Sequence, residues 1–170
     1  EIDPRVQRGT GAAIVARIAE TGEELWRVPT GGSAADLLIA DRTVFVVTVD
    51  TLSALDLETG AYRWHVTLES SGEDAAFTGL AIADGLVYAG YFLGFEQPYG
   101  IYALDAESGN ERWTYEQENF MEEGTWLTGG PVVAGGMVFA GNSFGGFSAL
   151  DAQSGGGGWA AAWWRSWASP

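Results

Sequence analysis

Short apolar runs separated by two-residue turns recur along the chain and predict antiparallel strands. Three stretches consist of an apolar run, a turn pair and a second apolar run: residues 37–49, 80–92 and 132–142. The turn pairs are Asp41-Arg42, Asp84-Gly85 and Gly135-Gly136. Asp-Gly and Gly-Gly pairs between β-rich runs are hairpin signals. The nearly continuous apolar character of the runs favours strands that are covered on both faces.

A second pattern follows these hairpins and repeats at a fixed internal spacing. An Ala, then a Thr-Gly or Ser-Gly pair, then a Trp occur in residues 14–26, 52–64, 101–113 and 147–159. The Thr-Gly or Ser-Gly pair predicts another tight turn between two strands. The Trps stand 38, 49 and 46 residues apart, in or near the range of a four-stranded blade.

Together the two patterns predict an all-β fold of four-stranded antiparallel units. Such units cannot bury their faces alone, and radial stacking into a β-propeller leaves only short edges exposed. A β-sandwich is the competing architecture, but it does not explain a Trp that recurs in step with Thr-Gly. We therefore expect one partial propeller domain over residues 1–170. Its expected parts are a blade remnant (1–30), three blades (31–70, 71–118 and 119–160) and a degenerate tail (161–170).

The repeat resembles the tryptophan-docking motif of PQQ-type propellers, Ala-x-Asp-x-x-Thr-Gly-x-x-x-Trp. The matching residues are Ala54, Asp56, Thr59, Gly60 and Trp64; Ala103, Asp105, Ser108, Gly109 and Trp113; and Ala149, Asp151, Ser154, Gly155 and Trp159. The first copy keeps Trp26, but Ile18 stands where Asp is expected.

The resemblance implies that these residues are structural. Each Trp is implied to lie between blades, over the turn of a neighbouring blade, where a large ring is buried and its N–H finds a partner. The relatives include quinoprotein dehydrogenases and BamB-like assembly lipoproteins, which implies an extracytoplasmic location. About three and a half blades are either a fragment or half of a ring that a second copy completes.

The amino-acid composition limits the kinds of partner and site that the protein can have. The net charge is −15, with 23 acidic and 8 basic residues, so binding to nucleic acid is not expected. A surface this acidic favours solubility, and it also fits a salty, halophilic medium, where ions screen self-repulsion. There is no Cys, which excludes disulfides and thiolate sites. No signal-peptide pattern and no apolar stretch long enough to span a bilayer is visible.

Two unusual connections are the candidate binding region, and both are expected at the same rim of the propeller. They are residues 92–99, within the blade at 71–118, and residues 116–126, which lead into the next blade. The candidate contact residues are Phe92, Phe95, Glu96, Tyr99, Phe120, Met121 and Trp126. Aromatic and Met side chains are common at interface centres. The alternative is that the aromatic side chains close over blade edges while the acids face water.

No catalytic constellation is visible, so the expected function is a non-catalytic scaffold that binds a protein or another ligand. The expected partner is a protein or further blades, and no cofactor or metal is expected. The alternative is a fragment of a PQQ-dependent dehydrogenase, which would need PQQ and Ca²⁺ held by oxygen ligands. Candidate oxygens such as Glu118, Asn119 and Asn142 follow no recognisable ligand pattern, and His65 follows a docking Trp on an outer strand.

The C-terminal end departs from the repeat. Four Trps fall within residues 159–167, where an outer strand with polar alternation is expected. Trp favours membrane interfaces, but the segment is short and has no amphipathic period. We therefore interpret it as the frame-shifted or truncated end of a longer gene, and we expect little order beyond Trp159.

Overall fold

The computed structural model describes residues 12–31, 34–69, 75–94, 97–117 and 127–157, and the backbone of 159–162. In these residues all regular secondary structure is β, arranged as one two-stranded and three four-stranded antiparallel sheets. The first sheet contains β1 (Ala13–Arg17) and β2 (Glu24–Pro29). The second contains β3 (Asp36–Ala40), β4 (Thr43–Val47), β5 (Thr51–Asp56) and β6 (Tyr62–Thr67).

The other two sheets repeat the plan of the second. The third sheet contains β7 (Ala76–Ala83), β8 (Leu86–Phe92), β9 (Tyr99–Asp105) and β10 (Glu111–Gln117). The fourth contains β11 (Val132–Ala134), β12 (Met137–Gly141), β13 (Gly146–Asp151) and β14 (Trp159–Ala162). Strand β14 continues two residues into the segment expected to be the tail, because Ala162 still pairs with Gly146.

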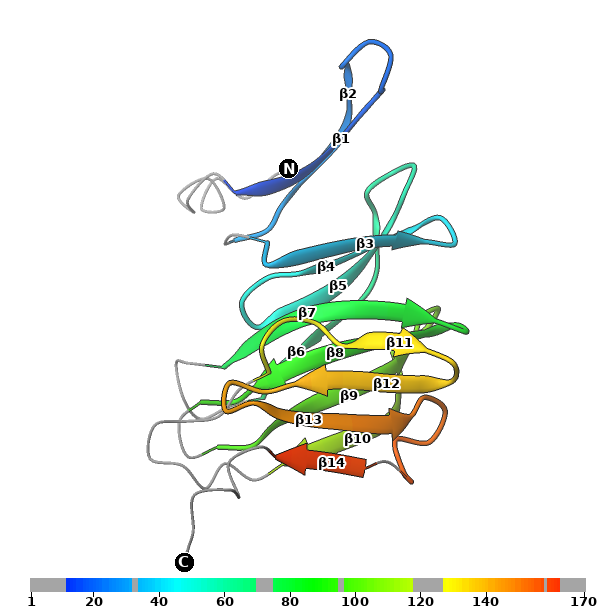
Figure 1. Cartoon of the computed structure of the whole chain (residues 1–170). Coiled ribbons are helices and arrows are strands. Elements are labelled where there is room, and N and C mark those ends of the chain that lie inside the picture. Colours follow the sequence, from blue (N-terminus) through cyan, green and yellow to red (C-terminus); the bar gives the residue numbers. More distant parts are fainter. Residues whose placement is uncertain are drawn as a thin grey trace, which may run out of the picture.

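The sheets stack in chain order and the stack is open (Figure 1). This arrangement confirms the expected all-β, partial propeller. The turns that join β3 to β4, β7 to β8 and β11 to β12 lie at one side, which we call the turn rim (Figure 1). The turns after β5, β9 and β13 belong to the same rim, and the connections that leave β4, β8 and β12 form the opposite loop rim.

The hairpins at the turn rim have the backbone that their sequences predict. Both central residues of each turn have positive φ, at 44° and 62° for Asp41 and Arg42, and at 50° and 75° for Asp84 and Gly85. Type I′ turns require this conformation and match the twist of the flanking strands. Arg42 adopts it without being Gly and forms an exposed ion pair with Glu58 at 2.6 Å.

The second strands of the second and third sheets, β4 and β8, are almost entirely apolar because their two faces contact different neighbours. In β4, Val44 and Val46 pack toward the first sheet, while Phe45 and Val47 pack toward the third. All five residues of β4 are buried. In β8, Val87 packs against the second sheet in the same way and Tyr88 packs against the fourth. The core is therefore a series of layers between sheets.

Three indoles connect consecutive sheets through the turn rim. The Nε1–H groups of Trp26, Trp64 and Trp113 donate to the carbonyls of Leu57, Ala106 and Ala152, at 3.0, 3.1 and 3.0 Å. Each acceptor lies in the turn of the following sheet. A Cβ at Gly60, Gly109 or Gly155 would stand 2.6–2.7 Å from the ring above it. The motif Gly therefore has two functions, since it adopts a positive φ and leaves room for the indole.

Each of the three covered turns is stabilised by the carboxylate of its own Asp, which accepts hydrogen bonds from the turn residues. Asp56 Oδ1 accepts hydrogen bonds from the amides of Glu58 and Thr59 and from the Thr59 hydroxyl. Asp105 and Asp151 repeat this pattern with Ser108 and Ser154. Hydrogen bonds from Arg63 and Thr59 hold the pKa of Asp56 well below its usual range. The turn after β1 forms without an Asp, because the Gly22 amide still donates to the Ile18 carbonyl at 2.8 Å.

The innermost strands approach one another at one level of the stack. Asp36, Gly79 and Gly130 occupy equivalent positions: Asp36 begins β3, Gly79 lies within β7, and Gly130 lies just before β11. Asp36 Oδ2 accepts the Leu80 amide at 2.9 Å, next to the register shift between Phe77 and Gly79. A Cβ on Gly79 would lie 2.6 Å from the Gly130 backbone. The sequence patterns did not reveal this contact, which fixes the spacing of the blades near their inner edge.

Replacing Gly60 by Ala is expected to destabilise the fold more than replacing Gly22 by Ala. Their φ values are 72° and 73°, so both substitutions carry a similar strain of about 1 kcal/mol. Only the Cβ at Gly60 meets an indole, since no described atom lies within 4 Å at Gly22. The overpacking should add about 1–3 kcal/mol. Urea unfolding followed by tryptophan fluorescence measures the difference, and equal losses for the two variants would contradict the docking role of Gly60.

Candidate binding rim

The loop rim between the third and fourth sheets is the candidate site. It is formed by the connection from β8 to β9 (residues 93–98), by the end of β10, and by residues 142–145 after β12. Of the candidate contact residues, Phe92 and Tyr99 belong to the described part. The other five lie outside the described residues: Phe95, Glu96, Phe120, Met121 and Trp126. The described residues therefore show the base of the rim and its nearest surface.

Tyr99 is part of the support beneath the surface. It is 5 % exposed, and its hydroxyl donates to Gln117 Oε1 at 2.5 Å and accepts from Asn142 Nδ2 at 3.2 Å. Burial raises the pKa of Tyr99, which keeps the hydroxyl protonated as the donor to Gln117. Tyr99 thus connects β10 with the loop after β12. We infer that it shapes the rim and that an incoming ligand would contact its neighbours.

Asn142 is the centre of the loop after β12. Its Oδ1 accepts the amides of Phe144 and Gly146 at 3.1 and 2.7 Å, which closes the turn. Its Nδ2 contacts Tyr99, and its backbone forms a β-bridge with Leu127. Asn142 therefore connects the fourth sheet to the third through its side chain and to the segment that enters the fourth sheet through its backbone. Sequence patterns placed Asn142 only among possible oxygen ligands, and they gave Gln117 no role.

A second tyrosine extends the polar base to an exposed acid. Tyr91 is fully buried and stacks on Tyr102 with ring centroids 4.5 Å apart. Its hydroxyl donates to Glu116 Oε2 at 3.4 Å. Burial first, and then the neighbouring Tyr102 and Glu116, raise the pKa of Tyr91 far above its usual value. The hydroxyl stays protonated, so it can orient the exposed Glu116 carboxylate without becoming charged.

Glycine at position 100 allows this region to close. A Cβ on Gly100 would overlap the carbonyl oxygen of Tyr115 and would lie 3.1 Å from the Tyr91 hydroxyl. The close pairing of β9 with β10 places Tyr99 opposite Gln117. The close approach of the β9 and β10 backbones at Gly100 thus brings the Tyr99 and Gln117 side chains into contact.

The surface above this base is varied and mostly polar. Gln97, Glu116 and Thr128 are exposed, and Pro98 and Phe144 are half-buried. The base is rigid because its hydrogen bonds join three chain segments, while the surface combines amides, an acid and apolar groups. Such a surface suits recognition of another macromolecule, since interfaces combine aromatic and polar contacts on a preorganised support.

The turn rim has a cavity of a different kind. A volume of about 450 Å³ between the second and third sheets is lined in part by Thr43, Phe45, Arg63 and Asp105. Thr43 is smaller than Leu86 and Met137, which begin the equivalent strands β8 and β12. Arg63 donates to Asp56 Oδ2 at 2.7 Å and to the Thr43 hydroxyl at 2.9 Å. Its charge is therefore already compensated within the second sheet.

Metal-ligating residues do not cluster in the described ranges. Within them, no three His, Cys, Asp or Glu side chains gather as a metal ion would require. His65 is exposed on β6, and its ring contacts Tyr62 at a centroid distance of 6.4 Å. The described residues contain no helix that is long and apolar enough to cross a membrane.

The stacked four-stranded sheets, joined by an indole over each following turn, define a segment of a β-propeller. A family model described as "Outer membrane protein assembly factor BamB" matches residues 5–169. The chain therefore belongs to the PQQ-repeat β-propeller family.

The chain is also similar to parts of longer proteins. It is 30 % identical over 168 residues to the serine/threonine-protein kinase AfsK of Streptomyces griseus, covering 89 % of this chain and 20 % of the kinase. The crystal structure of BamB from Moraxella catarrhalis has a TM-score of 0.63 and 24 % identity, over 91 % of this chain and 44 % of that one. The quinohemoprotein alcohol dehydrogenase from Comamonas testosteroni has a TM-score of 0.73 and 18 % identity, over 89 % and 32 %. The chain thus spans less than half the length of each of these proteins.

Replacing Tyr99 by Phe is expected to destabilise the protein by about 1–3 kcal/mol. The change removes the acceptor of the Asn142 amide and the donor to Gln117, and leaves both half-buried groups without this partner. Thermal or urea unfolding measures the loss. Tyr62→Phe is the matched control, because Tyr62 is 56 % exposed and should change stability by less than about 0.5 kcal/mol. Equal effects of the two substitutions would show that the hydroxyl of Tyr99 does not support the rim.

Proposed function

We propose that the chain is a non-catalytic propeller segment that binds a protein partner through its loop rim. The observation that carries the proposal is the contrast between the two rims. At the turn rim, hairpins of the same backbone conformation repeat, and so do the turns of the docking motif. Indoles cover three of these motif turns. At the loop rim the connections differ in sequence from sheet to sheet, and those of the third and fourth sheets are joined by the hydrogen bonds of Tyr99 with Gln117 and Asn142. Variable surface on a rigid scaffold is where binding residues concentrate.

The relatives support a binding role. The family description names an outer membrane protein assembly factor, and assembly of proteins requires contact with them. The kinase AfsK is a much longer protein, of which this chain corresponds to a fifth. A propeller segment attached to other domains would then supply recognition while the rest supplies other activities. By the same family relation we propose that the chain functions outside the cytoplasm.

Charge indicates which partner surface the rim fits. The chain has a net charge of −15. Glu116 is exposed at the rim, and the Tyr91 hydroxyl donates a hydrogen bond that orients its carboxylate. Complementary charge speeds association and disfavours wrong partners. The proposed partner therefore offers basic and hydrogen-bonding groups to the rim.

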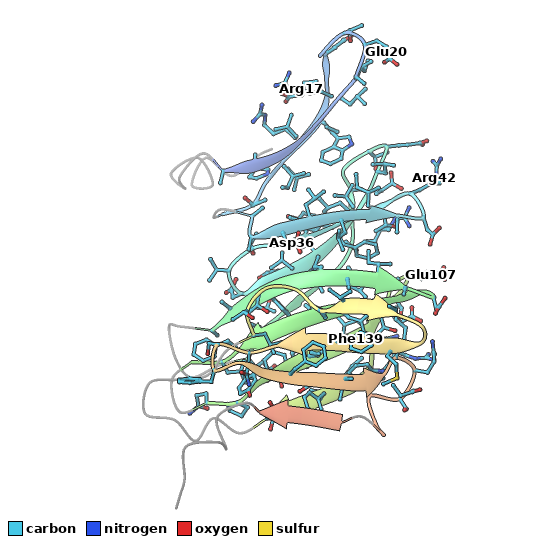
Figure 2. All side chains as sticks on the ribbon, viewed as in Figure 1. Arg17, Glu20, Asp36, Arg42, Glu107 and Phe139 are labelled. Carbon is cyan, nitrogen blue, oxygen red and sulfur yellow. The ribbon has the colours of Figure 1, made fainter. Side chains whose placement is uncertain are left out.

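Reversing the charge of Glu116 should weaken partner binding by about tenfold or more, corresponding to about 1.4 kcal/mol. The partner is captured from an extract of the source cells on immobilised chain and identified, and its affinity is then measured for Glu116→Lys. The matched control is Glu107→Lys, which makes the same charge change in the third sheet at the turn rim (Figure 2). We expect the control to bind within about twofold of the unchanged chain. Equal losses for both variants, or no loss for Glu116→Lys, would rule out this rim.

A second candidate is a segment of a PQQ-dependent dehydrogenase. The observation that favours it is the TM-score of 0.73 to a quinohemoprotein alcohol dehydrogenase. The sequence identity is 18 %, so this similarity shows a shared fold only. The described residues do not fit the cofactor. They hold no cluster of acidic and His side chains for Ca²⁺, and the indoles of Trp26, Trp64 and Trp113 are already covered by turns.

Titration with PQQ and Ca²⁺ separates the two candidates. A scaffold is expected to leave the quinone absorbance and the melting temperature of the protein unchanged. A saturable absorbance change at micromolar PQQ, together with a rise in melting temperature, would instead support the dehydrogenase segment, because a ligand that binds the native state stabilises it.

A further inference from the structure

The cavity at the turn rim between the second and third sheets lies where side chains occupy the next interface of the stack. Phe45 and Trp64 beside the cavity have ring centroids 5.8 Å apart at an interplanar angle of 50°. Tyr88 and Trp113 repeat this pair between the third and fourth sheets, at 5.8 Å and 47°. The two pairs differ by one hydroxyl, since Tyr88 donates to the buried Ala152 carbonyl at 3.1 Å and Phe45 has no such group.

Two further differences between the interfaces keep this cavity open. Thr43 pairs with Asp56 as Leu86 pairs with Asp105, so a small side chain stands where the next sheet has a larger one. Ala106 is half-buried, whereas the equivalent Ala152 is 1 % exposed. The volume of about 450 Å³ is within the range of about 300–1,000 Å³ found for small-molecule sites.

A hydrogen-bond acceptor in the cavity wall has a position that the protein does not use. The Ala152 carbonyl accepts from both Trp113 Nε1 and the Tyr88 hydroxyl, at 3.0 and 3.1 Å. Among the described residues, the Ala106 carbonyl accepts from Trp64 Nε1 alone, at 3.1 Å. A carbonyl oxygen has two lone pairs. A donor group in the cavity can therefore take the place that a tyrosine hydroxyl has in the next interface.

The charges around the cavity favour a cation. Carboxylates of Asp41, Asp105 and Glu107 line it, together with the guanidinium of Arg63. Arg63 is paired with Asp56 at 2.7 Å, so its charge is compensated from outside the cavity. The remaining carboxylates give the mouth a negative potential, which attracts cations.

Asp105 also has an oxygen to offer. Within the described part of the chain, its hydrogen bonds come from Glu107 and Ser108, and all of them reach Oδ1. Oδ2 is therefore available to a ligand. Hydrogen bonds from the Ser108 amide and hydroxyl lower the pKa of Asp105, which keeps the carboxylate charged at neutral pH.

The inner wall of the cavity is apolar. Phe45 belongs to the core cluster between the second and third sheets, and Ala40 and Ile82 pack against that cluster. A ligand that fits this wall has an apolar body as well as a charged group.

We propose that the cavity binds a small organic cation, namely a primary amine with an apolar body. Its ammonium group donates to the Ala106 carbonyl and to Asp105 Oδ2, and its body packs against Phe45 and Ile82. An ammonium group has three donors and no acceptor, which matches a wall of carbonyl and carboxylate oxygens. The lining falls within residues 40–107, between two four-stranded sheets and at the rim opposite to the proposed partner surface. Neither end of the stack takes part, and the proposal does not depend on the partner.

Isothermal titration calorimetry with three probes of similar shape tests the ligand class. The probes are phenethylamine, phenethyl alcohol and phenylacetate, at concentrations up to the millimolar range. We expect the amine to bind at least about tenfold more tightly than the alcohol, and the anion to show no saturable binding. Equal binding of amine and alcohol, or no saturable binding of the amine, would overturn the proposal.

The substitution Phe45→Tyr supplies the hydroxyl that this interface lacks. The new hydroxyl should donate to Ala106 as Tyr88 donates to Ala152, and so occupy the place of the ammonium group. Phenethylamine should then bind about tenfold more weakly or less. The melting temperature should rise, because the change fills space and uses a spare acceptor. A folded Phe45→Tyr variant that binds the amine as tightly as the unchanged chain would refute the site.

A matched pair of substitutions tests the carboxylate. Asp105→Asn and Asp151→Asn make the same change in equivalent turns, where each aspartate Oδ1 accepts two amides and a Ser hydroxyl. Their melting temperatures should therefore fall by similar amounts. Asp105→Asn should weaken phenethylamine binding by about tenfold, while Asp151→Asn should stay within about twofold of the unchanged chain. Equal weakening by both, or by neither, would show that the amine does not bind at Asp105.

Discussion

An indole that lies over the Gly turn of the next sheet is the contact on which the rest of the stack depends. It fixes the distance between consecutive sheets at the turn rim, where Trp64 donates to Ala106 and its ring lies against Gly109. Because the distance is fixed there, β4 and β8 can bury both faces against neighbours. Close packing in turn requires residues of matched size on the facing strands.

The loop rim follows from the same constraint. With the turn rim occupied by indoles and repeated hairpins, variation in sequence is tolerated mainly at the opposite side. There the blades are connected by Asn142, which contacts Tyr99 and its own loop. A rim built in this way can change its surface residues while the sheets below keep their spacing.

The parts that the sequence predicted are those in which a local pattern repeats. The spacing of Trp and Gly predicted the four-stranded units, and the turn pairs predicted hairpins such as Asp84-Gly85 because type I′ geometry is a local property. The contacts of Tyr99, Gln117 and Asn142 could not be predicted in this way, since they join residues from three segments. Asp36 was predictable in part. The sequence shows an Asp where the equivalent positions 79 and 130 hold Gly, but only the structure identifies the Leu80 amide as its hydrogen-bond partner.

One repeat carries both halves of the docking contact, the Gly turn that accepts and the Trp that donates. A duplicated repeat therefore enters the array already able to contact the blade before it and the blade after it, and no compensating substitution is needed in either neighbour. The loss of one whole repeat leaves an array with the same contacts. Arrays of this kind can change length in evolution by whole blades, while the turn after β1 shows that even a copy without the Asp keeps the backbone of the acceptor.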